Sequence, residues 1–267
     1  MRITRSVRRA GPALLAAVVA TGSLAGCNEI APLDPTLHAA FLTVDPDDDF
    51  GVTVEGDLTR VTAAATNTST NTRLVVWRAG APVTADQRSC VSWAEEDTTT
   101  GHHLQQGVAL RIRSEAGRTR AIVVTKNMWS SGFWTYDVHV MDSAADQPFV
   151  RLGRVDMIDV VVRSGVLAPA PWRLCAQVVD DTVTVKLWPA DVAEPPWGDG
   201  VHGGSIALPP GWDAPGVAGW YAGHVGPGQA LDLLDPRIVP LSAPPAAPGD
   251  LMGSQLAKRH GAPATRD

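Results

Sequence analysis

Cys27 is the residue whose position in the sequence most directly indicates a chemistry. It ends the tetrapeptide Leu-Ala-Gly-Cys of residues 24–27, which looks like a bacterial lipobox, in which the thiol takes a diacylglycerol before cleavage. Four arginines within residues 2–9 form a basic start, and residues 11–23 form an apolar run. A membrane-spanning helix needs about 20 apolar residues, so this shorter run predicts a lipoprotein signal peptide over residues 1–26.

Removal of this segment leaves a strongly acidic chain. The full sequence has 22 Lys and Arg and 28 Asp and Glu, and residues 1–27 hold four of the basic residues and none of the acidic ones. The mature chain therefore has 18 basic and 28 acidic residues, a net charge of −10. Such a charge argues against nucleic acid or an anionic lipid surface as a partner. We expect contact with the membrane through the lipid anchor.

Cys90 and Cys175 are the two thiols that remain once Cys27 carries the lipid. Exported proteins fold in an oxidising compartment, where an even number of cysteines favours pairing. Neither residue belongs to a Cys-x-x-Cys motif, and each lies in a strand-like apolar context. We therefore predict one structural disulfide and no redox or nucleophilic cysteine.

Two groups of residues have side chains that bind metal ions in other proteins. Residues 45–49, Asp-Pro-Asp-Asp-Asp, offer the oxygen ligands that Ca²⁺ prefers, but they are not an EF-hand, since Gly56 stands where the twelfth-position Glu would be. We favour an acidic turn there. Adjacent His102 and His103 would point to opposite faces of a strand, an arrangement that rarely binds one ion. No cofactor is predicted.

Short runs rich in β-branched residues recur along the chain, with turn residues between them. No ten-residue window outside the signal peptide shows a helical stripe, so the pattern predicts an all-β sandwich or barrel. We place a single domain at residues 41–240, after a tether at residues 27–40, and expect the Ser/Ala/Pro/Gly-rich residues 241–267 to be disordered. The strand-like runs are residues 51–55, 73–77, 89–93, 107–113, 121–125, 134–141 and 159–162.

The strongest pattern lies near the end of this domain. Residues 172–179 and 182–188 alternate apolar with polar side chains, and an Asp-Asp pair separates them, which predicts a β-hairpin. A Pro/Gly-rich loop follows, with Glu-Pro-Pro-Trp at residues 194–197. Residues 215–224 then form a Gly-punctuated aromatic segment that we expect to be a strand.

The order of these segments resembles the closing strands of concanavalin A-like jelly rolls, the fold of laminin G, lectin and glucanase domains. The likeness rests on the hairpin, on Lys-Leu-Trp-Pro at residues 186–189, on the loop at residues 194–197 and on Gly-Trp-Tyr-Ala-Gly-His at residues 219–224. It is closest to versions in secreted actinobacterial lipoproteins. The resemblance implies an antiparallel jelly-roll-like β-sandwich and leaves the function open, since this fold hosts lectins, hydrolases and adhesion modules.

The resemblance also directs attention to carboxylates, because glucanases of this fold use a strand motif resembling Glu-x-Asp-x-x-Glu. Alternation places its three carboxylates on one face, as nucleophile, helper and acid/base. The nearest segment here, residues 95–100, has Thr100 in the place of the acid/base residue. A double displacement without that proton donor cannot protonate the leaving group. We therefore predict no catalytic residue.

Nine tryptophans, against two tyrosines and four phenylalanines, are the unusual feature of the composition. Most should pack in the core, where aromatic side chains dominate burial. Trp188, Trp197 and Trp220 lie in or beside the closing segments, and an aromatic face on a rim stacks well on a sugar ring. Together with His224, these are the residues that we predict to bind a ligand.

The leading interpretation is a lipid-anchored protein on the extracytoplasmic face of the cell membrane, with a non-catalytic binding module for glycan or another envelope component. The first alternative is a glycoside hydrolase of the same fold whose carboxylates do not follow the motif. It would show two carboxyl groups about 5–10 Å apart in one groove. The second alternative is a structural or adhesion module that contacts another protein through a flat exposed apolar patch.

The lipobox gives the first testable prediction. Cys27→Ala removes the sulfur that would carry the diacylglycerol, so the protein should be released from membranes or accumulate as an unprocessed precursor. Membrane fractionation followed by intact-mass measurement checks this outcome. Unchanged membrane partition and unchanged processing of the variant would contradict the prediction.

Overall fold

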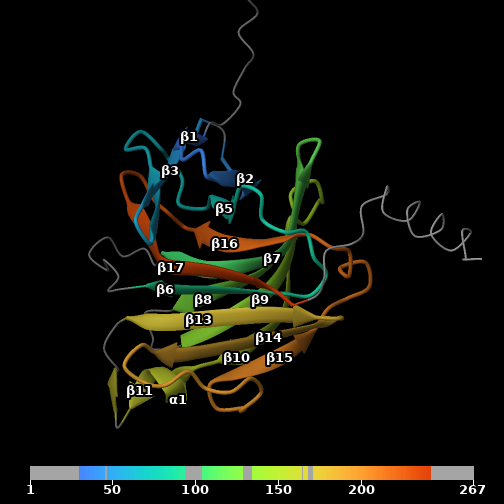
Figure 1. The fold of residues 1–267 in the computed structure, drawn as a ribbon. Helices are drawn as coiled ribbons and strands as arrows, with labels where there is room; N and C mark the ends of the chain where they lie inside the picture. The colour runs from blue at the N-terminus through green and yellow to red at the C-terminus, as the bar shows by residue number, and fades with distance from the viewer. Residues whose placement is uncertain are drawn as a thin grey trace, which may run out of the picture.

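The computed structural model describes residues 30–45, 47–93, 104–128, 134–163, 165–167 and 171–241. Within this part of the chain, strands dominate, and the one helix is the four-residue α1, Ile158–Val161. Two large sheets pack on each other as a sandwich (Figure 1). The predicted all-β sandwich is confirmed.

The first sheet has eight strands in the order β1-β3-β4-β17-β6-β13-β14-β15. Its pairs are antiparallel except β1 with β3, which is parallel. Its strands are β1 Ile30–Leu33, β3 Phe50–Glu55, β4 Leu58–Ala63, β6 Gln87–Trp93, β13 Trp172–Val179, β14 Thr182–Pro189, β15 Gly203–Ala207 and β17 Ala230–Pro240.

The second sheet has seven strands in the order β10-β9-β8-β7-β16-β5-β2, and all of its pairs are antiparallel. A separate two-stranded ribbon joins β11 Val162–Arg163 to β12 Val166–Leu167. The strands of the seven-stranded sheet are β2 Leu37–Thr43, β5 Arg73–Arg78, β7 Gln105–Glu115, β8 Arg118–Met128, β9 Trp134–Asp142, β10 Phe149–Asp156 and β16 Val217–Gly223.

The predicted hairpin is formed by β13 and β14. Its register pairs Leu174 with Leu187 and Val178 with Val183, so apolar side chains lie opposite one another on the inner face of the sheet. Asp180 in the turn has a φ of 51°, in the left-handed region that Asp tolerates better than most residues. Period-two alternation and turn chemistry thus act together to form this hairpin, as the sequence predicted.

The main core lies between the two sheets and is built from the inward half of each alternating strand. Trp220 on β16 is fully buried there, and its Nε1 donates a hydrogen bond of 3.1 Å to the carbonyl oxygen of Cys90 on β6. This bond crosses from one sheet to the other and uses the polar atom of a buried indole. Core residues around it include Val76, Val91, Val108, Leu110, Ile122, Leu174, Val185 and Leu187.

The seven-stranded sheet is strongly curled. The guanidinium carbon of Arg73 on β5 lies 4.7 Å from the ring centroid of Phe149 on β10, although four strands separate β5 from β10. In a flat sheet, strands about 4.8 Å apart would place them about 24 Å from each other. The outer face of this sheet therefore encloses a second apolar cluster: Leu42, Val75, Ala109, Ile112, Ala121, Val123, Met141 and Tyr221.

Two expectations from the sequence are wrong. Residues 30–33 and 37–40, which we assigned to a tether, belong to β1 and β2, so the domain begins before residue 41. Leu37 and Leu42 are buried, which shows that this segment contributes to packing. Residues 159–162, expected to be a strand, lie mostly in α1, where a carboxylate oxygen of Asp156 accepts a hydrogen bond from the Ile158 amide.

Several predictions concern residues outside the described part of the chain. These are Cys27 and the signal peptide, the acidic segment at residues 95–100, His102 and His103, and the tail beyond residue 241. Within the described residues, no helix has the length and hydropathy needed to cross a membrane.

The predicted disulfide between Cys90 and Cys175 is confirmed. The two residues lie directly opposite each other on neighbouring strands β6 and β13, with their Cα atoms 4.1 Å apart and their sulfurs bonded. The bond lies on the outer face of the eight-stranded sheet, because Val91 and Leu174 next to it face the core. It joins segments that are 85 residues apart in the sequence.

Loss of this bond should destabilise the sandwich. In a chain with both Cys90→Ala and Cys175→Ala, the free energy of unfolding should fall by about 2–4 kcal/mol, because the unfolded chain regains the freedom that the cross-link removes. Urea denaturation of the two proteins measures the difference. Identical denaturation midpoints would show that the disulfide does not contribute to the free energy of unfolding.

Candidate functional site

The structure separates the four residues that the sequence grouped as ligand-binding. Trp188 and Trp197 belong to the outer side of the eight-stranded sheet, Trp220 lies between the sheets, and His224 follows β16. Trp220 is fully buried, so our prediction that it contacts a ligand is wrong, and its ring packs in the core instead. Trp188 is 2% exposed, and therefore its ring face is not available to stack on a sugar.

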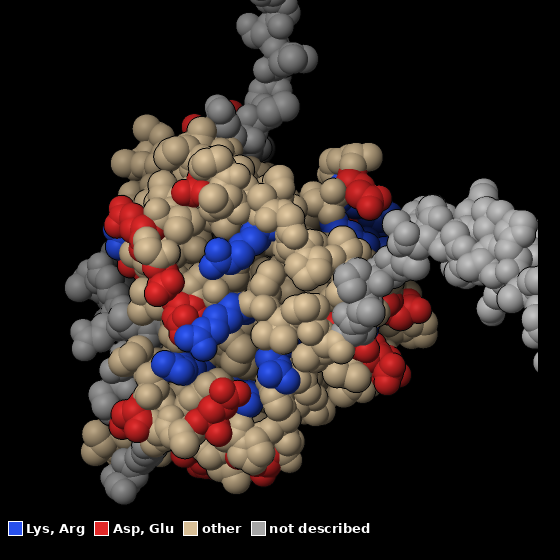
Figure 2. All heavy atoms as spheres, in the orientation of Figure 1, with Lys and Arg blue, Asp and Glu red and all other residues tan. Residues whose placement is uncertain are grey.

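Basic side chains gather on the outer face of the eight-stranded sheet. Because Leu174 and Val185 point into the core, their neighbours Arg173 and Lys186 point outward, and Arg237 on β17 pairs with the outward Cys90. Figure 2 shows Lys and Arg near the middle of the visible face, in the region of β17, β6 and β13, with Asp and Glu mainly around them. An acidic protein thus concentrates positive charge on this sheet.

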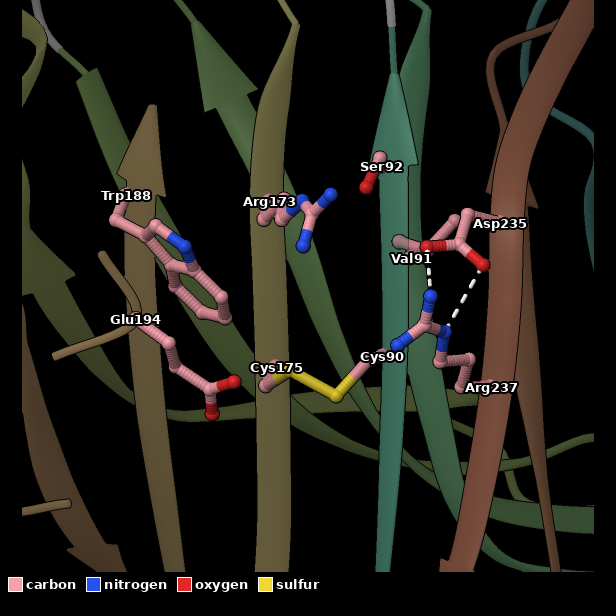
Figure 3. Close-up of a pocket in the computed structure, with 9 residues that line it drawn as sticks. All are labelled: Cys90, Val91, Ser92, Arg173, Cys175, Trp188, Glu194, Asp235 and Arg237. Carbon is pink, nitrogen blue, oxygen red and sulfur yellow. Dashed lines mark hydrogen bonds and ion pairs between the residues drawn. A yellow bond between two sulfur atoms is a disulfide. The ribbon is translucent and has the colours of Figure 1, made fainter. Parts of the chain in front are cut away.

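A small hollow opens in this face above the disulfide. Its volume is about 50 Å³, and its lining comes from β6, β13, β14, β17 and the loop after β14 (Figure 3). Four adjacent paired strands hold most of these side chains in place. The lining residues are Cys90, Val91, Ser92, Arg173, Cys175, Trp188, Glu194, Asp235 and Arg237.

Both carboxylates at the hollow already have a cation as a partner. Asp235 accepts from Arg237 in a two-point arrangement, with 2.9 Å to Nε and 2.7 Å to Nη2. Glu194 accepts a hydrogen bond of 2.6 Å from the Nζ of Lys186. The two-point contact between Asp235 and Arg237 fixes the orientation of both groups as well as their separation.

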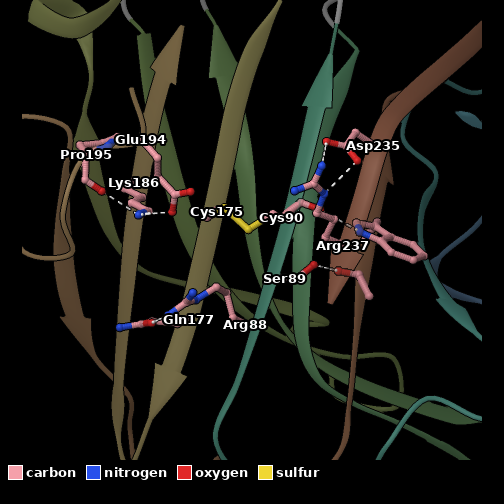
Figure 4. The surroundings of a disulfide bond; sticks show 12 residues. Arg88, Ser89, Cys90, Cys175, Gln177, Lys186, Glu194, Pro195, Asp235 and Arg237 are labelled. Atoms are coloured by element: carbon pink, nitrogen blue, oxygen red, sulfur yellow. Dashed lines mark hydrogen bonds and ion pairs between the residues drawn. A yellow bond between two sulfur atoms is a disulfide. The ribbon is translucent and has the colours of Figure 1, made fainter. Parts of the chain in front are cut away.

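The loop after β14 is clamped onto the sheet by Lys186, as Figure 4 shows beside the disulfide. The Lys186 side chain is almost fully buried, and its Nζ also donates to the carbonyl oxygen of Pro195 at 2.8 Å. The same Nζ lies 4.3 Å from the ring centroid of Trp197, and the guanidinium carbon of Arg88 lies 4.7 Å from it. Cation–π contacts therefore hold the half-buried Trp197 over β6 and β14.

His224 has a structural role at the other sheet. Its Nδ1 lies 2.8 Å from the carbonyl oxygen of Thr70 and therefore donates, which leaves Nε2 to accept from Arg73 at 3.2 Å. Arg73 is nearly buried and donates to both the carbonyl and side-chain oxygens of Asn71. His224 thus fixes Arg73 at the place where β5 and β10 approach each other, which we call the mouth of the curled sheet.

The neighbouring polar groups at this mouth are paired with one another. Asp137, which is buried, accepts from Asn127 at 3.1 Å, from Arg151 at 3.3 Å and from Arg154 at 3.2 Å. Burial lowers the pKa of His139 to about 4. Asp137 opposes this shift, and Arg73 and Arg151 add to it. The buried hydroxyl of Tyr221 donates to Gln105, and burial raises the pKa of Tyr221.

No metal site is visible in the described residues, because no three His, Cys, Asp or Glu side chains converge there. The acidic run at residues 45–49 instead anchors the loop after β4: a carboxylate oxygen of Asp48 accepts from the Thr68 amide at 2.9 Å. His202 pairs with Asp199 at 2.6 Å.

Sequence reasoning missed Arg173 and Arg237, two of the residues that define the hollow. Arg173 follows from the hairpin itself, since it alternates with Leu174 and must point outward once the inner face is known. Arg237 carried no such signal, because its strand β17 has irregular pairing between Leu234 and Arg237.

Comparisons with known proteins identify no family. No family model matches the chain, and no curated protein matches it. The exoplasmic/lumenal domain of VIP36 in its Ca²⁺/Man3GlcNAc-bound form is 13% identical, with a TM-score of 0.48 and coverage of 77% of this chain and 89% of that chain. A legume lectin-like domain from Entamoeba histolytica is 9% identical, with a TM-score of 0.43 and coverage of 73% and 90%.

A third solved structure, the CBM2 module of the evolved Dit of Lactobacillus casei BL23 phage J-1, is 11% identical, with a TM-score of 0.34 and coverage of 68% and 67%. At these scores the likeness concerns the fold, and no ligand or site residue is taken from it.

The state of His139 predicts a pH dependence of stability. Its pKa of about 4 in the folded chain lies below the ordinary 6.5, so the unfolded chain binds more protons between these values. The stabilisation is complete above pH 6.5 and should be lost as the pH falls toward 4, by roughly 2 kcal/mol after allowance for partial exposure. Urea titrations at several pH values measure it. His139→Gln should flatten this dependence, and an equal slope in both proteins would contradict the assignment.

Proposed function

We propose that this protein is a lipid-anchored module that binds glycans at the extracytoplasmic face of a cell membrane, through the outer face of its eight-stranded sheet. The observation that carries the proposal is the hollow above the disulfide, where charged, hydroxyl and indole groups converge on one open space. A small number of well-placed polar groups beside aromatic surface is the usual composition of a small-molecule site.

The hollow also has the chemical diversity that a glycan requires. Sugar hydroxyl groups both donate and accept hydrogen bonds, and the lining offers donors on Arg173 and Ser92 as well as acceptors on Glu194 and Asp235. The sheet, the disulfide and the Lys186 clamp hold these groups in place before a ligand arrives. Such preorganisation reduces the entropy lost on binding.

The mouth of the curled sheet is a weaker candidate. Its charged groups bind one another, as the contacts of Asp137 with Arg151 and Arg154 show. The apolar residues beneath them are buried, including Val123 and Tyr221. A ligand there would have to break existing ion pairs, whereas the hollow also presents Arg173 and Ser92, whose side chains have no hydrogen-bond or ion-pair partner among the described residues.

A glycoside hydrolase is the second candidate, because Glu194 and Asp235 both line the hollow. Hydrolysis requires one carboxyl group to protonate the leaving oxygen and the other to act as nucleophile or base. Here each carboxylate is bound by its own cation, Lys186 or Arg237, and would have to give up that contact to protonate a leaving group or to attack a sugar. Binding without turnover therefore fits the geometry better.

The adhesion alternative has less support. Large exposed apolar side chains in the described residues come from different elements of the fold, including Phe149 and Val150 on β10, Val166 on β12 and Val179 on β13. Single exposed apolar residues are normal on a protein surface, whereas a docking face requires a contiguous patch.

The anchor and the location at the membrane rest on the sequence of residues 1–27. The lipobox cysteine would place the domain close to the membrane surface, within reach of envelope polysaccharides. In this arrangement a lipid is followed by a short connection and then by the binding module, which suits the capture of a polymer at the membrane surface.

Trp197→Ala tests the site. The Trp197 ring holds the loop that carries Glu194, so its loss should weaken glycan binding by up to about tenfold, the value of one aromatic contact. Because Trp197 is half-buried in a loop, the unfolding midpoint should change little. Calorimetry with a panel of envelope polysaccharides measures the affinity, and Trp77→Ala, a half-buried tryptophan on the other sheet, is the matched control.

Three results would overturn this proposal in different ways. Reducing sugar released by repurified protein would favour the hydrolase. Absence of binding to every polysaccharide would favour the structural alternative. Equal weakening by Trp197→Ala and Trp77→Ala would place binding elsewhere on the protein.

A further inference from the structure

Three hydrogen-bond donors at the hollow are unused. Among the described residues, the structure shows no acceptor for the Arg173 guanidinium, the Ser92 hydroxyl or the Trp188 indole N–H, although all three residues line the hollow. Trp188 is 2% exposed and Ser92 is 8% exposed, whereas the Arg173 side chain is exposed. Figure 3 shows Arg173 between Trp188 and Ser92, with all three side chains facing the same space.

The hollow thus presents three donors to one open space: the Arg173 guanidinium, the Ser92 hydroxyl and the Trp188 indole N–H. A positively charged guanidinium beside two neutral donors matches an oxyanion, which offers several acceptor oxygens and forms charge-assisted hydrogen bonds. Neutral sugar hydroxyls would satisfy these donors less well, since they carry no negative charge.

The balance of charge leads to the same class of ligand. Asp235 is bound to Arg237 and Glu194 is bound to Lys186, so these two pairs are locally neutral. Arg173 is then the charge at the hollow without a counter-ion among the described residues. A ligand that brings one negative charge would complete the site.

The size of the hollow limits which part of the ligand enters. Its volume of about 50 Å³ is far below the roughly 300–1,000 Å³ of pockets that enclose a whole small molecule. A carboxylate or a phosphate oxygen group fits, and a complete sugar ring does not. The ring would remain above the sheet, beside the loop that Trp197 holds.

We propose that the hollow is a subsite for the oxyanion of an acidic glycan, held by Arg173, Ser92 and the Trp188 indole N–H. This inference rests on the proposed function and narrows it to glycans that carry a carboxylate or a phosphate ester. The protein therefore discriminates acidic from neutral polysaccharides despite its own net negative charge.

The test compares three probes with the purified full chain. An oligomer of galacturonic acid carries carboxylates, a phosphorylated mannan carries phosphate esters, and an oligomer of galactose carries neither. We expect an acidic probe to bind at least about tenfold more tightly than the neutral one, and this preference to shrink as salt is raised. Which acidic probe binds better identifies the oxyanion.

Variants of the three donors locate the effect. Arg173→Gln removes the charge from an exposed side chain and should weaken the acidic probe by about ten- to a hundredfold, while Arg173→Lys should recover part of the loss. Trp188→Phe removes the indole N–H and keeps an aromatic ring, and should have a smaller effect in the same direction. Arg60→Gln is the matched control, since Arg60 lies on β4 of the same sheet but does not line the hollow.

The outcomes separate this inference from the proposed function. Equal affinity for acidic and neutral probes, with no change in Arg173→Gln, would overturn the oxyanion subsite and leave glycan binding standing. No binding to any probe or polysaccharide would overturn both. Inorganic phosphate that competes with the acidic probe in wild type, and fails to do so in Arg173→Gln, would support the subsite directly.

Discussion

The pairing of β6 with β13 is the interaction on which the rest of the structure depends. On the outer face, the Cys90–Cys175 disulfide joins the two strands covalently. On the inner side, Trp220 from the opposite sheet donates its indole hydrogen bond to the carbonyl oxygen of the same Cys90. One short stretch of β6 is therefore tied both to its neighbour and to the other layer. The hairpin of β13 and β14 is positioned by this pairing, and the hollow lies on the strands that it fixes.

The outer faces of the two sheets differ in how accessible they are, and this difference decides where a ligand can bind. The seven-stranded sheet curls until Arg73 and Phe149 meet, so its outer face becomes a second core capped by paired charges. Polar groups there stabilise the protein. The outer face of the eight-stranded sheet stays accessible and carries Arg173 and Arg237 over the disulfide. A ligand-binding site requires polar side chains that are held in place and still able to form hydrogen bonds or ion pairs with a ligand, and the outer face of the eight-stranded sheet supplies them.

The sequence predicted those features that depend on local alternation. The hairpin followed from period-two patterning, and the disulfide from the count of thiols in an exported chain. Residues 30–40 were missed because they are short runs interrupted by Pro32 and Pro35, and residues 159–162 because three consecutive valines after an Asp suit a strand or a helical turn equally. Trp220 and His224 were misplaced for another reason: whether a side chain faces core or solvent depends on which layer covers it, which no local pattern encodes. Alternation in the hairpin was enough to predict that Arg173 points outward, but that it has no partner among the described residues emerges only from the packed strands.

The most direct test of this account is nuclear magnetic resonance of the full chain titrated with an oligomer of galacturonic acid. Backbone amides, the Trp188 indole N–H and the Arg173 guanidinium can be followed separately. The account predicts that the largest shifts fall on Arg173, Ser92 and Trp188, with little change at Tyr221 or His139. Shifts concentrated at the mouth of the curled sheet, with Arg173 and Trp188 unchanged, would contradict it.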